Sequence, residues 1–246
     1  MKLVTSLSPR RLGHQKSCID SWIAAGFEVV AVQSKGESKT LESDFPEVTF
    51  VETDLVGDLF GASKHVRISA LTQQAKEESI LILNSDLKIV SSPEFQEFWK
   101  QSEDKELKVG IRHDRQGSNA MTLFKWGIDV FRVTPQIAAD LPDIGMTIGQ
   151  PAWDYWIPWH LFNKCGYKVT TSIPLGIQFV HNAHTRTWSN SQYQIGLKLF
   201  EQHYGISGKD LTEWIQEITG RKKLHTRKVS ANRTAVRKPN PRLRTK

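Results

Sequence analysis

The sequence places candidate chemistry at the end of a strongly apolar run. Ile80–Leu83 leads directly into Asn84-Ser85-Asp86. A continuous apolar run of this kind predicts a strand buried on both faces, as in a parallel sheet covered by helices. Ligands of open α/β sheets bind at the carboxyl ends of such strands, so the triplet stands where a charged ligand or its metal would be held. Asn, Ser and Asp also favour turns, and a turn without a ligand is the alternative interpretation.

Asp154 is a second candidate because it lies within the aromatic segment Ile148–His160. A buried carboxyl must be paired or hydrogen-bonded, or else its pKa rises. An acid in an apolar cleft is therefore a candidate general base, and equally a candidate structural cap. Three tryptophans at three-residue spacing, the first of them Trp153, predict a helical stripe that belongs to the core. Pro158 predicts a kink or a fresh helix start, since it cannot donate a helix hydrogen bond.

Two histidines follow the predicted strand Ile177–Val180 at three-residue spacing, His181 and His184. A neutral imidazole at this place would offer a nitrogen to a metal that Asp86 holds on the other side. The pair is sparse, and a surface position explains a single histidine equally well.

The loop after the first predicted strand contains Arg10 and Arg11. Two guanidinium groups have the geometry that binds a diphosphate, although a solvated surface pair is the simpler interpretation of each. The loop contains neither G-x-G-x-x-G nor G-x-x-x-x-G-K-[ST]. This absence argues against a dinucleotide oxidoreductase and against a P-loop enzyme.

The elements that must position these residues alternate between strand and helix. Strand, helix and strand within the first 32 residues form a βαβ unit, and Ser92-Pro93 and Thr134-Pro135 are typical helix starts. The alternation predicts an α/β fold with a mostly parallel sheet. The predicted strands are 3–7, 27–32, 48–51, 80–83, 107–111, 123–133, 167–171 and 177–180. The predicted helices are about 14–25 and 63–76, those starting at Ser92 and Thr134, one from a cap at Asn190 or Ser191 to Tyr204, and one capped by Ser207.

Composition limits the class of protein. At 246 residues, with 39% hydrophobic and 24% charged residues, the chain has room for one large α/β domain or two small ones. No run approaches the length of a membrane span, and the first residues are too weakly apolar for a secretion signal. Cys18 and Cys165 give no disulfide framework and no metal-ligand spacing. A reducing, cytoplasmic setting is expected.

The formal charge of +7 is concentrated at one end of the chain. Eleven of the 33 Lys and Arg residues lie between Arg221 and Lys246, where there is no acid, so residues 1–220 hold 22 basic and 26 acidic side chains. The segment has few large hydrophobic residues and two prolines. We therefore expect a basic tail that is disordered when free, following a body that ends near residue 220.

Two segments are unusual as a combination: a G-x-D-x-F strand at Gly127–Phe131 and I-G-x-P-x-W-D-x-W at Ile148–Trp156. Together with Asn84-Ser85-Asp86, they resemble the GT-A type glycosyltransferases, the nucleotide-diphospho-sugar transferase superfamily. The resemblance covers roughly residues 3–188. It implies a single GT-A (Rossmann-like) domain with a central, mostly parallel sheet flanked by helices, followed by a C-terminal helical segment and the basic tail. Other residues that carry it are Ser6, Leu7, Arg11, Gln15, Ser21, Trp22, Gly26 and His181.

The family implies roles for these positions. Its central strand ends in D-x-D, whose acids hold the divalent metal and the ribose, whereas here Asn84 replaces the first acid. The implied metal ligands are Asp86 and His181, for Mn²⁺ or Mg²⁺, since few protein carboxylates suffice when substrate phosphates complete the octahedron. Asp154 would be the catalytic base of an inverting enzyme, or would orient a sugar in a retaining one. Asp129 would contact the sugar, with a purely structural role as its alternative. The implied donor-binding residues are Ser6, Leu7, Arg10, Arg11, Gln33, Asn84, Ser85, Asp86 and Asp129.

The predicted function is transfer of a hexose or pentose from a nucleotide-diphosphate sugar, first of all a UDP-sugar, to an acceptor hydroxyl. The acceptor is a glycan or modified-base DNA. The basic tail is expected to contact a polyanion: DNA, RNA or an anionic membrane surface. The alternative is a non-catalytic nucleic-acid-binding protein on an α/β scaffold. It is disfavoured because the acidic body has no basic stripe and because it leaves the three aspartates and His181 unexplained.

Overall fold

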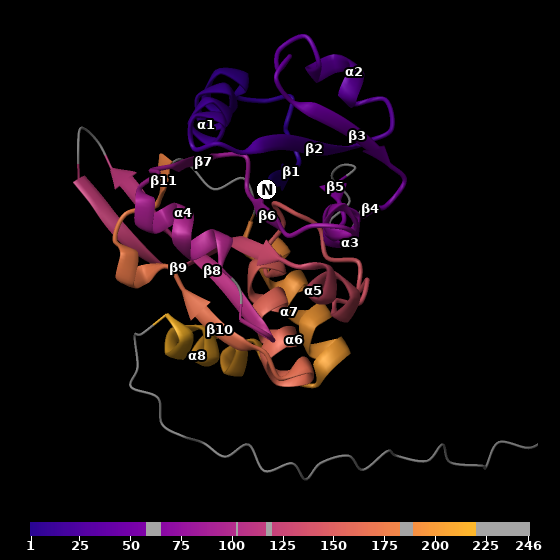
Figure 1. Cartoon of the computed structure of the whole chain (residues 1–246). Helices are drawn as coiled ribbons and strands as arrows, with labels where there is room; N and C mark the ends of the chain where they lie inside the picture. The colour runs from indigo at the N-terminus through magenta and orange to yellow at the C-terminus, as the bar shows by residue number, and fades with distance from the viewer. Residues whose placement is uncertain (58–64, 102, 117–119, 183–188, 220–246) are drawn as a thin grey trace, which may run out of the picture.

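A mixed sheet forms the centre of the molecule (Figure 1). The computed structural model describes residues 1–57, 65–101, 103–116, 120–182 and 189–219. Within these ranges nine strands pair in the order β3-β2-β1-β6-β9-β8-β11-β7, and β10 joins the side of β8. Five of the pairings are parallel and three are antiparallel. The predicted α/β class, with a mostly parallel sheet flanked by helices, is confirmed.

The strands of this sheet are β1 (Lys2–Thr5), β2 (Glu28–Ser34), β3 (Thr49–Thr53), β6 (Ile80–Leu83), β7 (Leu87–Ile89), β8 (Glu106–Gln116), β9 (Ala120–Val133), β10 (Lys168–Thr171) and β11 (Phe179–Asn182). β4 (Val56–Gly57) and β5 (His65–Val66) pair as a separate two-stranded antiparallel sheet. The helices are α1 (Leu12–Ala24), α2 (Ser38–Leu41), α3 (Ile68–Thr72), α4 (Pro93–Lys100), α5 (Pro135–Asp140), α6 (Trp153–Cys165), α7 (Asn190–Tyr204) and α8 (Gly208–Ile218), with 3₁₀ turns at Gln73–Ala75 and Ile173–Leu175.

The predicted central strand is correct. β6 lies between β1 and β9, and the side chains of Ile80–Leu83 are all fully buried. Both faces are covered because alternate residues of the strand enter different cores. Ile80 and Ile82 face the core under α3, α5 and α6, whereas Leu81 and Leu83 face the core under α1 and α4.

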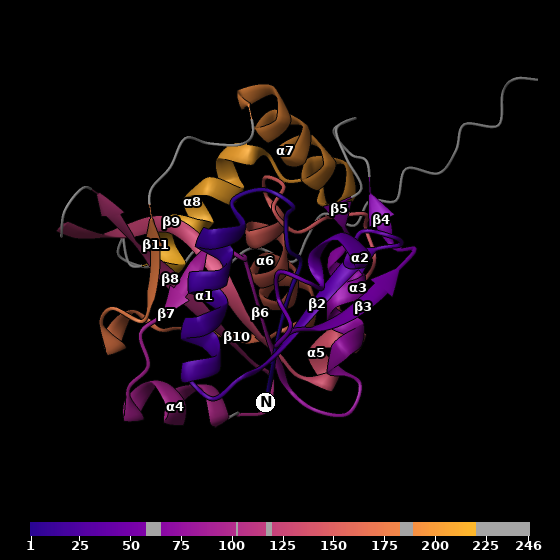
Figure 2. The ribbon, with the colours of Figure 1, turned by 90° about the horizontal axis from the view of Figure 1, so that it is seen from above.

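The two faces of the sheet carry different helices (Figure 2). α1 and α4 pack on one face through Trp22, Phe95 and Trp99. α6 packs on the other face, and α7 and α8 lie outside it at the edge of the fold. The three tryptophans of α6 are buried, with exposures of 2%, 1% and 7% for Trp153, Trp156 and Trp159. The predicted core stripe is therefore confirmed.

The capping residues act largely as predicted. The hydroxyls of Ser92, Thr134 and Ser207 accept the N–H of Phe95, Ile137 and Asp210 at 3.1, 3.1 and 3.2 Å. Such caps satisfy helix N–H groups that have no partner within the helix. The predicted cap of α7 was misplaced. Ser189 forms it, in a capping box with Gln192.

One other prediction of local structure is wrong, and one of the two outcomes expected at Pro158 does not occur. The helix expected over 63–76 is shorter, because Val66 pairs in β5 and α3 begins only at Ile68, while 58–64 lie outside the described residues. Pro158 causes no fresh helix start. α6 runs through it, because tertiary packing of the aromatic stripe outweighs the one hydrogen bond that a proline omits.

The basic tail and its predicted disorder lie outside the described residues, as does His184. No helix in the described part of the chain is both long and apolar enough to cross a membrane.

Candidate functional site

Asp86 is held at the end of the central strand by α1. Asn84-Ser85-Asp86 forms the turn from β6 into β7, and the N–H of Leu87 reaches the carbonyl of Asn84 at 3.4 Å. Three α1 residues bind the backbone of 86–89. Trp22 Nε1 donates to Leu87 O at 2.7 Å, Ser21 Oγ accepts the N–H of Ile89 at 3.0 Å, and His14 Nε2 lies 3.3 Å from Asp86 O. Positions 14, 21 and 22 share one face of a helix, so one helix face fixes the turn.

β11 brings His181 beside this turn. It runs antiparallel to β7 and parallel to β8, which places His181 opposite Leu87 on one side and Asp114 on the other. His181 Nε2 lies 3.4 Å from Asp86 Oδ2, and its Nδ1 lies 3.1 Å from Asp114 Oδ1. Since a carboxylate only accepts hydrogen bonds, each ring nitrogen needs a proton, or in the case of Nε2 a bound cation, between it and the carboxylate that it faces.

A β-bulge turns Asp129 into the same region. Gly110 pairs with Val130 and Ile111 with Ile128, so Asp129 is an extra residue in β9. Bulges re-aim side chains and are common beside functional sites. Asp129 is 3% exposed; its Oδ1 accepts from Asn84 Nδ2 at 2.9 Å and its Oδ2 accepts from Arg112 Nη1 at 3.1 Å.

Arg112 connects Asp129 to Asp114, the residue that contacts His181. Its Nε lies 3.0 Å from Asp114 Oδ1, an ion pair without the alignment of a hydrogen bond. Its guanidinium carbon also lies 4.3 Å from the centre of the Phe124 ring. Arg112 and Asp114 stand two apart on β8 and therefore share a face. The result is a continuous chain of polar contacts from Asn84 to Asp86.

Asp154 belongs to the same electrostatic cluster. It lies in the first turn of α6, after Ala152, whose φ of 76° is left-handed. Burial raises the pKa of Asp154 well above its usual range, and the charge of Asp129 raises it further. The backbone N–H groups of Asp154 and Tyr155 and the charge of Arg112 oppose this rise without cancelling it. Asp154 as a whole residue is half-buried.

The cluster has an excess of negative charge. Burial also raises the pKa of Asp129, against the opposing charge of Arg112. For Arg112 itself, burial lowers the pKa, but Asp129, Asp114 and Asp86 outweigh burial and raise it overall. Four carboxyl groups thus surround one guanidinium. A surplus of this sign favours a bound cation.

The donor set fits a divalent cation of the Mg²⁺ or Mn²⁺ type. Among the described residues, no group of three or more His, Cys, Asp or Glu is arranged to hold a metal, so protein ligands alone do not complete a site. Asp86 and His181 form a pair, and Asp114 stands behind the imidazole as the partner of its other nitrogen. Metal-binding histidines almost always have such a partner. Asp86 has 31% of its side chain exposed, which leaves it open to a phosphate-bearing ligand that would supply further oxygens.

The predicted donor-binding loop lies at the ends of β1 and β2. Gln33 is fully buried; its Oε1 accepts from Ser6 Oγ at 2.9 Å and its Nε2 donates to Leu7 O at 3.0 Å. Gln15 bonds the backbone of Ser8 and Arg10 at 2.7 to 2.9 Å. Two glutamines therefore shape the loop. The side chains of Arg10 and Arg11 are exposed, in accord with either a surface pair or a contact with a diphosphate.

Thr5 joins this loop to the central strand, because its hydroxyl donates to Leu83 O at 2.8 Å. The structure therefore brings the loop, Asn84, Ser85 and Asp86 to one edge of the sheet. It brings Asp129 and His181 to the same edge, with Asp154 in electrostatic reach. The individual roles of these residues stay predictions.

Sequence reasoning missed Arg112 and Asp114. The predicted strand ended at Ile111, just before the polar run Arg112-His113-Asp114-Arg115. β8 in fact continues to Gln116. The alternation of Arg112 with Asp114, in phase with the strand before them, is the signal that would have found both residues.

No protein-family model and no curated protein matches the sequence. Among solved structures, the chain is similar to HddC from Yersinia pseudotuberculosis complexed with GMP-PN, at 10% identity and a TM-score of 0.37, over 81% of this chain and 100% of that one. It is similar to the inositol-1-phosphate CTP transferase from T. maritima at 11% and 0.39, over 81% and 96%. The glycosyltransferase GlyE of Streptococcus pneumoniae TIGR4 gives 11% and 0.43, over 87% of this chain and 63% of that one. Likenesses this weak assign no activity.

Proposed function

We propose that this protein is a metal-assisted glycosyltransferase of the GT-A type, which moves a sugar from a nucleotide-diphosphate sugar to an acceptor hydroxyl. The observation that carries the proposal is the contact of Asp86 with His181, backed by Asp114, at the carboxyl end of the central strand. It combines a half-buried carboxylate, an oriented imidazole and the carboxyl end of the central strand of an α/β sheet, which is where such sheets bind ligands. A UDP-sugar is the expected donor, and Mn²⁺ or Mg²⁺ the expected ion.

The residues take distinct parts in this reaction. A divalent cation held by Asp86 and His181 would supply charge neutralisation for the departing diphosphate. Asp154 accepts the proton of the acceptor hydroxyl, and its raised pKa brings it closer to neutral pH, where a general base works best. Asp129 has both oxygens engaged by Asn84 and Arg112, which favours a positioning role over direct sugar contact.

Donor turnover tests the proposal. A panel of sugar nucleotides is incubated with Mn²⁺ or Mg²⁺, and the released nucleoside diphosphate is measured. We expect hydrolysis of at least one donor by the wild type, and a loss of about 10²-fold or more in Asp86→Ala. Asp44→Ala, which removes an exposed carboxylate, is the matched control and keeps the wild-type rate.

Two results would overturn it. One is the absence of calorimetric binding for every sugar nucleotide in the panel. The other is release of pyrophosphate from a nucleoside triphosphate and a sugar 1-phosphate, which would indicate nucleotidyl transfer instead.

A further inference from the structure

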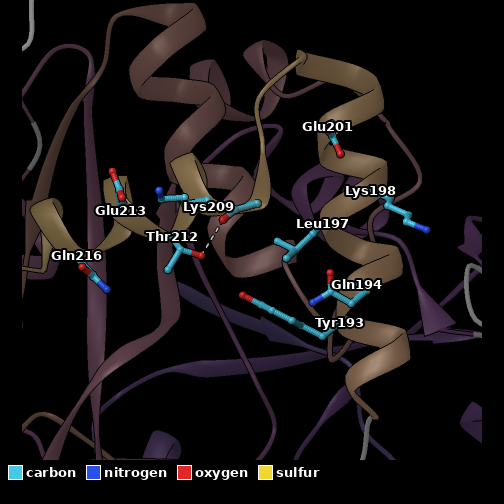
Figure 3. A pocket seen from close by; sticks show the side chains of 10 residues that line it. Tyr193, Gln194, Leu197, Lys198, Glu201, Lys209, Thr212, Glu213 and Gln216 are labelled. Atoms are coloured by element: carbon cyan, nitrogen blue, oxygen red, sulfur yellow. Dashed lines mark hydrogen bonds between the residues drawn. The ribbon is translucent and has the colours of Figure 1, made fainter.

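A groove of about 620 Å³ runs between α7 and α8 (Figure 3). Each helix lines it with the same spacing, i, i+1, i+4, i+5 and i+8, starting at Tyr193 on α7 and at Gly208 on α8. This spacing describes one helix face. The same helices also pack on the core. Phe200 meets Trp159 of α6 edge to face, with ring centres 5.0 Å apart, and Leu211 of α8 is fully buried. Tyr193 and Leu197 of the lining are themselves partly packed against this core. The groove is thus built by two firmly packed helices.

One end of the groove adjoins the first turn of α6. Gly196 of α7 rests on the segment just before that turn, since an added Cβ would lie 2.6 Å from Pro151 O. Tyr193, one turn earlier on α7, lines the groove and packs against the core cluster that contains Trp153 and Tyr155 of this first turn. The groove therefore begins beside the residues that carry Asp154.

The lining suits an uncharged, hydroxyl-rich ligand. Its charged residues are two lysines and two glutamates, which cancel, so a polyanion gains no net attraction there. Amide, carboxylate and ammonium groups offer both donors and acceptors, and a sugar hydroxyl needs both. Tyr193 and Leu197 extend from α7 toward α8 and provide an apolar surface, while Lys198 points outward (Figure 3). Ligand sites of this size commonly hold small organic molecules.

We propose that this groove is the acceptor subsite, and that it binds a neutral oligosaccharide whose reacting hydroxyl is presented to Asp154. The role as acceptor subsite rests on the proposed glycosyltransferase function, whereas binding of an oligosaccharide does not. The proposal selects the glycan from the two acceptor classes that the sequence left open.

Two tryptophan variants on α7 test the groove. Gln194→Trp fills it, and Ile195→Trp adds the same ring at the neighbouring position, which is 43% exposed and does not line it. The probes are neutral di- to tetrasaccharides of the cello-, malto-, xylo- and chito-series, observed by saturation-transfer NMR with the full-length chain. We expect at least one probe to bind the wild type and Ile195→Trp equally, and its signal to fall fivefold or more with Gln194→Trp. An excess of single-stranded DNA is expected not to displace it.

Transfer measurements separate the two proposals. All three proteins should hydrolyse the donor at equal rates, and Gln194→Trp should lose tenfold or more of the transfer to the bound oligosaccharide. If the wild type hydrolyses no donor, the proposed function fails and the binding measurement still decides the groove. If no probe binds in a manner sensitive to Gln194→Trp, or if DNA displaces the probe, the groove proposal is overturned even where donor hydrolysis is intact.

Discussion

Asp114 is expected to strengthen the binding of a cation by His181, and this effect can be measured as Mn²⁺ affinity without any assay of enzyme activity. Its carboxylate holds His181 Nδ1 at 3.1 Å and thereby directs Nε2 toward Asp86. Loss of such a partner typically weakens metal binding by about 10–100-fold. We expect Asp114→Asn to lower Mn²⁺ affinity by this amount and His181→Ala to lower it further, as measured by electron paramagnetic resonance of free Mn²⁺.

The control for this prediction is Asp44→Asn, which changes an exposed carboxylate far along the chain from the site. It should bind Mn²⁺ as the wild type does. Equal affinity in His181→Ala and the wild type, with both folded by circular dichroism, would show that His181 does not take part in a cation site, and equal affinity in Asp114→Asn alone would show that Asp114 does not support it.

Asp154 gives a prediction about pH. Burial and Asp129 raise its pKa in the folded protein above that of the unfolded chain. The stability that protonation contributes is therefore fully present below the unfolded-state pKa and is lost as the pH rises through the folded-state pKa. Asparagine cannot ionise, so Asp154→Asn should be more stable than the wild type at pH 8, with a smaller difference at pH 5, by urea unfolding. Transfer should fall by about 10²–10⁴-fold, as expected on loss of a general base.

Asp20→Asn, at an exposed position of α1, should show neither change. The opposite result for Asp154→Asn, a loss of stability at pH 8, would mean that its main role is to cap α6, because its carboxylate also accepts the N–H groups of the first turn.

At the scale of single residues, the sequence predicted which residues are candidates for the site but not the contacts that join them. Asp86 and His181 were predicted as a pair, and the structure places them 3.4 Å apart. The polar links between the candidates were not predicted, because Asp114 comes to lie beside His181, with Arg112 next to it, only when β8 pairs with β11. Neighbours across a sheet depend on register, which one strand does not specify alone.

Among the elements, the bulged strand β9 depends on a glycine. A Cβ on Gly127 would lie 2.7 Å from Phe124 Cδ1, 2.8 Å from Asp129 Oδ2 and 3.0 Å from Arg112 Cγ. Gly127→Ala must therefore displace the Asp129–Arg112 pair. We expect a loss of about 1–3 kcal/mol in the free energy of unfolding, together with reduced donor turnover.

Gly13→Ala is the matched control for Gly127→Ala, because it makes the same substitution at a glycine outside β9. Gly13 lies in α1, and a Cβ there meets nothing within 4 Å, so alanine should stabilise the helix by about 0.5–1 kcal/mol. Urea unfolding of both variants checks the pair. A Gly127→Ala protein with wild-type stability and turnover would show that the bulge adjusts without moving Arg112.

Elements with strong local signals were predictable, and elements defined by distant contacts were not. Ile80–Leu83 and the two proline-started helices follow from residue type and capping chemistry. α3 was predicted too long because the carbonyl of Val66 accepts the N–H of Ile148 at 3.0 Å, some 80 residues away in sequence, beside a bridge between Arg67 and Thr147. The fresh helix start, one of the two outcomes expected at Pro158, does not occur for a similar reason, since the packing of Trp156 and Trp159 keeps α6 continuous.

For the whole molecule, the distribution of charge separates two surfaces. Residues 1–220 hold more acidic than basic side chains, and the tail holds eleven Lys and Arg without an acid. The described body therefore offers a polyanion little attraction, while the groove between α7 and α8 is balanced in charge. Binding of nucleic acid and binding of an uncharged acceptor should consequently depend on different parts of the chain.

Deletion of residues 221–246 tests this separation. Because each neutralised phosphate contributes about 0.9 to the slope of log K against log salt, the full chain should bind a short DNA duplex with a steep salt dependence, by fluorescence anisotropy. The truncated chain should lose this binding at low salt and keep donor hydrolysis and oligosaccharide transfer at the rates of the full chain. If the truncated chain still binds DNA with the same slope, the contact lies in the body, and the charge balance of its surface does not govern partner choice. If instead truncation abolishes hydrolysis, the tail belongs to the donor site. Its Lys and Arg side chains would then neutralise the negative charge of the donor diphosphate beside Asp86.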